Sequence, residues 1–123
     1  MNEMMIKLFE QKIDEHIAAL DGVARYTRAY AYATLDYVRA PETAAVLMTS
    51  LEVEACVQLW QHASDKWDTF VEQDNGNKEK NIQLKFLCDG IWLSLMYNTE
   101  SRLKKYMEQM ITDMCNEVER VAL

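Results

Sequence analysis

The segment from Ile82 to Tyr97 constrains the fold of this chain more than any other. It is apolar around almost its whole circumference, with only Lys85 and Asp89 charged over its sixteen residues. As a helix it is too short to span a membrane, so protein must cover it. We expect one of its faces to pack into its own domain and a second face to be covered by a partner subunit.

Glycine and proline are rare in this chain. It has three glycines and one proline in 123 residues, and half of its residues are hydrophobic. A β-rich fold needs more turn residues than this, so the composition predicts a single all-α domain. The formal charge is 13 minus 20, or −7, which repels phosphate backbones. We therefore expect no DNA binding by this chain alone. Basic residues interrupted by glutamates are expected on solvated helix ends, namely Lys78, Lys80, Lys85, Arg102, Lys104 and Lys105.

Apolar residues recur at spacings of three and four along most of the chain, as in amphipathic helices. Asp21-Gly22, Pro41 and the run from Asp74 to Asn77 interrupt this pattern, and Thr49 has capping-box spacing to Glu52. The pattern predicts about six helices, which carry residues 5–20, 23–37, 42–48, 53–71, 82–97 and 103–121.

Residues suited to catalysis or to metal binding are sparse. His16 and His62 each lack a second histidine at helical spacing, and the chain has no Gly-rich phosphate loop. Cys56, Cys88 and Cys115 form no Cys-x-x-Cys pair and lie among apolar neighbours, so we expect buried, unreactive thiols. The sequence therefore predicts no catalytic residue, no metal site and no cofactor, and it argues against an enzyme.

Aromatic residues on the second and fourth expected helices are the best functional lead. Tyr26, Tyr30 and Tyr37 share one face of the second helix. Polar groups on such rings need bonding or hydration when buried, which suits a cavity better than a dry core. A small-molecule pocket and a core rich in methionine and aromatic residues both remain open. The candidate ligand-binding residues are Tyr26, Tyr30, Tyr37, Cys56, Trp60, Ala63, Trp67 and Phe70.

Asp89 lies on the most apolar of the expected helices. A carboxylate is costly there unless it meets a hydrogen-bond donor or water. We expect Asp89 to be exposed or paired. Binding of a cationic ligand and a polar contact across a subunit boundary remain as alternatives.

The string Asp89–Leu93, which reads Asp-Gly-Ile-Trp-Leu one helix before a C-terminal helix, resembles the dimerisation segment of tetracycline-repressor-like (TetR family) regulators. The order of the expected helices is also similar to the all-helical domain of that family over essentially the whole chain. The resemblance implies a single ligand-binding and dimerisation domain, with a connecting helix in residues 1–20, pocket helices in 21–75 and dimerisation helices in 79–121.

In that family the last two helices form a four-helix bundle with the same helices of a second subunit. The resemblance therefore implies a homodimer, a small-molecule effector, and DNA contact only through an N-terminal helix-turn-helix domain, which we expect to be absent from this chain. The implied interface residues are Phe86, Gly90, Trp92, Leu93, Met96, Tyr106, Met110 and Met114.

Two functions are consistent with these features. The first is the sensing and dimerising domain of a transcriptional repressor, in which a bound molecule relieves DNA binding by the other domain. The alternative is a helical adaptor or scaffold that docks a protein partner through residues 82–97. A cavity lined by the tyrosines and tryptophans would favour the first. The N-terminus has no signal-peptide pattern and no apolar run is long enough to cross a membrane, so we expect a cytoplasmic protein without membrane contact.

Overall fold

The computed structural model describes residues 2–40, 54–98 and 101–121, and in these ranges it is all-helical. The expected all-α fold is confirmed. The expected helix at 42–48 and the capping box at Thr49 lie outside the described residues. The helices are α1 (Asn2–Ala19), α2 (Arg25–Val38), α4 (Glu54–Glu72), α5 (Lys78–Tyr97) and α6 (Lys104–Arg120).

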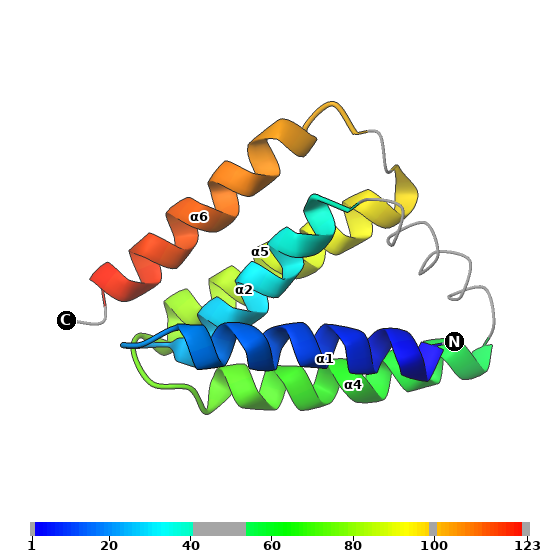
Figure 1. The fold of residues 1–123 in the computed structure, drawn as a ribbon, viewed down its shortest axis with the longest axis horizontal. Helices are drawn as coiled ribbons and strands as arrows, with labels where there is room; N and C mark the ends of the chain where they lie inside the picture. The colour runs from blue at the N-terminus through cyan, green and yellow to red at the C-terminus, as the bar shows by residue number, and fades with distance from the viewer. Residues whose placement is uncertain (1, 41–53, 99–100, 122–123) are drawn as a thin grey trace.

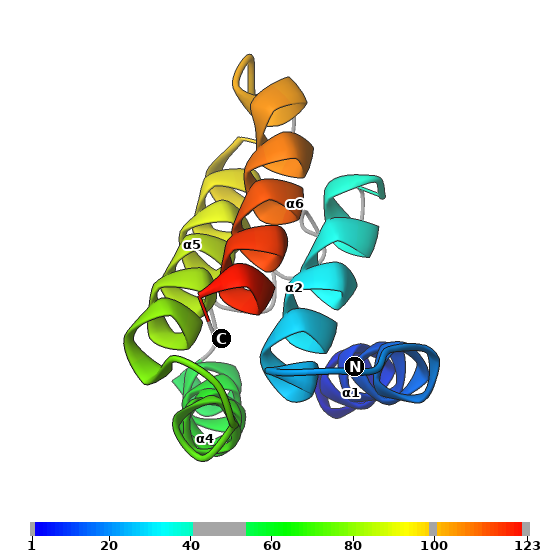
Figure 2. The same cartoon turned by 90° about the vertical axis from the view of Figure 1, so that its left-hand side faces the viewer.

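The helices form two layers. α1 and α4 lie side by side and run in the same direction, and in Figure 2 both are viewed nearly end-on beneath α2, α5 and α6. α2 and α5 run in one direction across this pair, and α6 returns antiparallel to them (Figure 1). α2 contacts each of the other four described helices. It is therefore the central element, which explains why most of its residues are buried.

α5 and α6 of the upper layer each bury one stripe of side chains at helical spacing. On α5 the stripe consists of Leu84, Cys88, Ile91 and Leu95, and on α6 it consists of Met107, Ile111, Cys115 and Val118. These side chains and the small residues of α2 form the core, which the hydrophobic effect holds together. In the described part of the chain, no helix is long and apolar enough to cross a membrane.

The start of α2 is capped by residues that are distant in the sequence. Its N-cap residue, Ala24, offers no side-chain acceptor and has a left-handed backbone, with φ of 55°. Asn75 Oδ1 accepts from the Ala24 amide at 2.7 Å, and Asp74 Oδ2 accepts from the Thr27 amide at 2.8 Å and from its hydroxyl at 2.7 Å. The turn between α4 and α5 therefore satisfies first-turn amides of α2, and the Asp74 charge suits the positive end of that helix.

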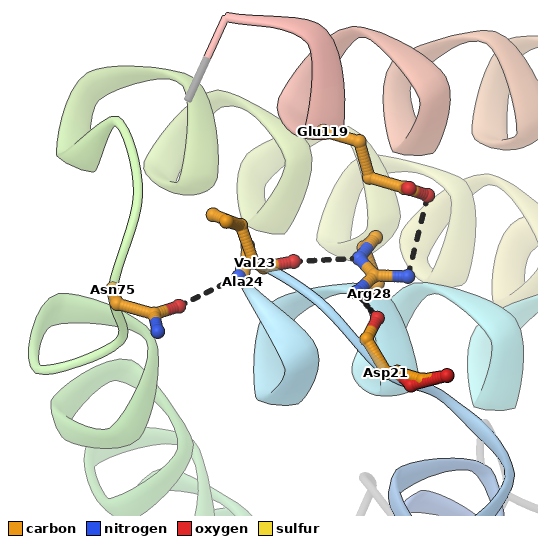
Figure 3. Close-up of polar contacts among 6 residues, drawn as sticks. All are labelled: Asp21, Val23, Ala24, Arg28, Asn75 and Glu119. Carbon is orange, nitrogen blue, oxygen red and sulfur yellow. Dashed lines mark hydrogen bonds and ion pairs between the residues drawn. The ribbon is translucent and has the colours of Figure 1, made fainter. Parts of the chain in front are cut away.

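Arg28 stabilises the loop between α1 and α2 through hydrogen bonds from its side chain (Figure 3). Its side chain is buried, with 3% exposed. Nε donates to the carbonyl oxygen of Val23 at 2.8 Å, Nη2 donates to that of Asp21, and Nη1 lies 3.2 Å from Oε1 of Glu119 on α6. One guanidinium thus joins the loop, α2 and α6, and the fixed geometry of its five donors suits it to this task.

Candidate functional site

A pocket of about 280 Å³ opens between α1, α2, α4 and α5. Apolar side chains form most of its lining, and all three tryptophans of the chain take part. Its volume is close to the lower end of the range for small-molecule sites. The lining residues are Met5, Phe9, Tyr30, Tyr37, Trp60, Ser64, Trp67, Asp89, Trp92 and Leu93.

Phe9 on α1 is at the centre of the aromatic contacts around the pocket. Its ring centroid lies 5.3 Å from that of Tyr30, 5.7 Å from Tyr37, 5.1 Å from Trp67 and 5.4 Å from Trp92. Most of these pairs meet edge to face, a favourable arrangement of ring quadrupoles. One buried ring of α1 therefore contacts α2, α4 and α5 together.

Asp89 is the charged group in the pocket lining, and the protein itself supplies its partners. The hydroxyl of Tyr30 donates to Oδ1 at 2.8 Å, and Nζ of Lys85 donates to Oδ2 at 2.6 Å. Burial and the neighbouring Asp89 carboxylate raise the pKa of Tyr30, so its phenol stays protonated and acts as a donor. The expected pairing of Asp89 is therefore present.

The expectation that Lys85 lies on a solvated helix end is wrong. Its side chain is only 3% exposed and also reaches Asp68 of α4, where Nζ lies 2.8 Å from Oδ1. The ammonium lies 4.8 Å from the centroid of the Tyr30 ring. Two carboxylates and an aromatic face thus compensate the lost hydration of this buried cation.

The structure brings together four of the eight candidate ligand-binding residues. Tyr30, Tyr37, Trp60 and Trp67 line the pocket, whereas Tyr26, Ala63 and Phe70 do not. The Tyr26 and Phe70 rings instead pack on each other, with centroids 5.1 Å apart. Ala63 is buried against the core, and the side chain of Cys56 lies outside the described residues.

Sequence reasoning missed the contributions of α1 and α5 to the pocket. Met5 and Phe9 fall in the first expected helix and Ser64 in the expected helix 53–71, but none of them was among the candidate ligand-binding residues. Trp92 and Leu93 were placed at a subunit interface. An apolar stripe identifies the buried face of a helix but not the helix that packs against it. The spacing of apolar residues therefore could not predict that these helices share a cavity.

Two exposed apolar stripes lie on the outer sides of α5 and α6. On α5, Phe86 and Leu93 are 69% and 51% exposed, and Gly90 lies between them. A Cβ added at Gly90 would meet nothing within 4 Å. Similar exposure is found at Leu103, the N-cap residue of α6, and at Tyr106 and Met110 within α6. Large apolar side chains at helical spacing on adjacent helices are typical of a surface that another protein covers.

The remaining implied interface residues are placed differently. The Trp92 ring packs against Tyr37 of the same chain, with centroids 4.8 Å apart, and is partly buried. Met114 is partly buried against the core. The side chain of Met96 lies outside the described residues.

Cysteine and histidine side chains form no second site in the parts of the chain that the structure describes. Burial raises the pKa of the Cys88 thiol and raises that of Cys115 to about 12, which keeps both protonated and weakly nucleophilic. His16 Nε2 lies 2.8 Å from Asp36 Oδ2, a contact between α1 and α2, and His62 is exposed. No group of three His, Cys, Asp or Glu among the described residues is arranged to hold a metal ion.

Comparison with known proteins gave one result. The model of the family described as tetracyclin repressor-like, C-terminal domain, matches residues 24–117, which are 94 of the 123 residues. The matched range contains α2, α4 and α5 and most of α6, and hence three of the four helices that line the pocket. Neither the curated proteins nor the solved structures gave a significant match.

Proposed function

The chain belongs to the tetracycline repressor-like family as one of its C-terminal domains, and on this premise we propose that it senses a small molecule and dimerises as part of a transcriptional regulator. The pocket between α1, α2, α4 and α5 is the observation that carries the sensing role. It favours a sensor over an adaptor or scaffold, because an adaptor has no need of an aromatic cavity within its own fold.

Sensing requires that the bound molecule favour one arrangement of the helices over another. α1 supplies Met5 and Phe9 to the pocket, so occupancy bears directly on how α1 packs. We propose that this changes DNA binding by a domain outside this sequence and relieves repression. The regulator would act in the cytoplasm, without turnover of the bound molecule.

Filling the pocket tests the sensing role. Ser64 lines the pocket from α4 and is partly buried, so Ser64→Phe places a ring in the cavity. We expect the substitution to weaken binding of the neutral fluorescent probe N-phenyl-1-naphthylamine by about tenfold or more, measured by titration of probe fluorescence. Gln61→Phe, on an exposed position of the same helix, is the matched control and should bind as the wild type does. Equal affinities of the three proteins would contradict binding in this pocket.

Dimerisation is proposed to use the exposed stripes of α5 and α6. In a two-fold symmetric interface each residue occurs twice, so one substitution places two charges in the contact. We expect Phe86→Glu to raise the dimer dissociation constant by about tenfold or more, because a buried, unpaired carboxylate is costly. Sedimentation velocity over a range of protein concentrations measures this.

Phe70→Glu is the matched control for this substitution. Phe70 is 42% exposed but lies on α4, outside the exposed stripes of α5 and α6. The Phe70→Glu substitution should leave the dimer dissociation constant unchanged. A wild-type monomer at all concentrations would reject the dimer, and equal effects of both variants would reject this face as the interface.

A further inference from the structure

The proposed function leaves the chemistry of the bound molecule open. The pocket combines aromatic walls with a carboxylate, and this pair of features is also the usual receptor for an organic cation, through cation–π attraction and charge. Two kinds of ligand therefore compete: an organic cation that binds Asp89, and a neutral apolar molecule for which Asp89 is not a receptor.

Lys85 decides between them because it already holds the position of a cation beside Asp89. Its ammonium lies 2.6 Å from Oδ2 of that carboxylate and 4.8 Å from the centroid of the Tyr30 ring. The hydroxyl of Tyr30 engages the other carboxylate oxygen. The carboxylate and the nearest ring, Tyr30, are thus engaged by the chain itself, and the formal charges of Lys85 and Asp89 cancel.

The position of Lys85 also makes a second cation unfavourable. Its side chain is buried, so water screens its charge weakly, and a cationic ligand beside Asp89 would meet this like charge at short range. Asp68, the other carboxylate near Lys85, is 56% exposed and does not line the pocket. Its charge faces solvent and offers little attraction to a molecule in the cavity.

The polar group of Trp67, another ring of the lining, is turned toward the protein as well. Nε1 of Trp67 donates to Oε2 of Glu10 at 3.3 Å, and that carboxylate also accepts from Lys66 at 2.8 Å. The indole nitrogen of Trp67 is therefore bonded within the chain, and the lining is mostly apolar. We propose that the pocket takes a compact, neutral, apolar molecule with an aromatic ring, and that Lys85, acting as an internal cation, excludes organic cations. This inference rests on the proposed sensing function.

A pair of isosteres isolates the charge of the ligand from its shape. Neopentylbenzene and benzyltrimethylammonium have the same framework, with a quaternary carbon in the first and a quaternary nitrogen in the second. All three tryptophans line the pocket, so their intrinsic fluorescence reports occupancy in the full chain. We expect wild-type protein to bind neopentylbenzene more tightly than the cation by about tenfold or more.

Substitution of the internal cation should remove most of this preference. Lys85→Met keeps the length of the side chain but removes its charge, which leaves the Asp89 carboxylate without its ammonium partner. We expect binding of benzyltrimethylammonium to strengthen by about tenfold, while binding of neopentylbenzene changes by less than about threefold. Asp89→Asn is the control: it removes the carboxylate and should leave the cation weakly bound and the neutral isostere unaffected.

The outcomes separate this inference from the proposed function. If wild-type protein binds the cation as tightly as the neutral isostere, or more tightly, the assignment of a neutral ligand is overturned while the pocket stands. If neither isostere changes the tryptophan fluorescence of the wild type, the pocket itself is rejected and the inference falls with it. Should Lys85→Met fail to fold, the comparison of the two isosteres on the wild type still tests whether the pocket prefers a neutral ligand.

Discussion

Arg28→Leu is expected to lower the free energy of unfolding by about 3 kcal/mol, because it removes two part-buried hydrogen bonds from a charged donor to loop carbonyl groups, at roughly 1.5–3 kcal/mol each. These are the carbonyls of Asp21 and Val23, which both accept from the guanidinium. Leucine fills part of the space but donates nothing. A urea titration followed by circular dichroism measures the loss, at one fixed protein concentration because self-association also stabilises the fold.

Glu119→Gln is the matched control for Arg28→Leu. Glu119 lies at the outer end of the same cluster, with 48% of its side chain exposed, and the amide oxygen of glutamine can still accept from Arg28. An exposed ion pair contributes little, so we expect a change of less than about 1 kcal/mol. If both variants lose the same free energy, the ion pair and not the loop carbonyls accounts for the role of Arg28.

The helices themselves were predictable from the sequence because helix formation is signalled locally. Apolar spacing and the Asp21-Gly22 break located α1 and α2 to within a few residues of their observed ends. The run from Asp74 to Asn77 was recognised as a turn. Its second role, as the cap of α2, was not recognised. Asp74 and Asn75 bind amides at the start of that helix, which lie 47 and 51 residues away in the sequence. Only the packed fold brings the two together.

The site was harder to predict because it depends on which faces meet. Tyr30, Tyr37, Trp60 and Trp67 were selected for their shared helix faces, and the structure places them around one cavity. Tyr26 and Phe70 follow the same spacing but lie beyond it, in contact with each other. Lys85 was assigned to solvent by its charge. Its burial follows from three partners on α2, α4 and α5, namely Tyr30, Asp68 and Asp89.

Phe9→Ala is expected to cost about 3–5 kcal/mol of unfolding free energy, the usual range for truncation of a buried aromatic side chain. Phe9 is 2% exposed and its ring contacts four other rings, so the loss combines transfer free energy, a residual cavity and aromatic pairs. The same change enlarges the pocket and weakens the hold on α1. We therefore expect faster amide hydrogen exchange in α1 than in α6, because the four rings that contact Phe9 lie on α2, α4 and α5 and not on α6.

Leu8→Ala, at the adjacent position, separates the contact made by Phe9 from the helix propensity of α1. Leu8 is 44% exposed, and alanine favours helix at least as well as leucine, so we expect a loss of less than about 1 kcal/mol. Uniformly faster exchange over α1 and α6 in Phe9→Ala would mean that the whole domain unfolds as one unit. α1 would then have no independent movement through which the pocket could act, and the proposed route from ligand to DNA-binding domain would fail.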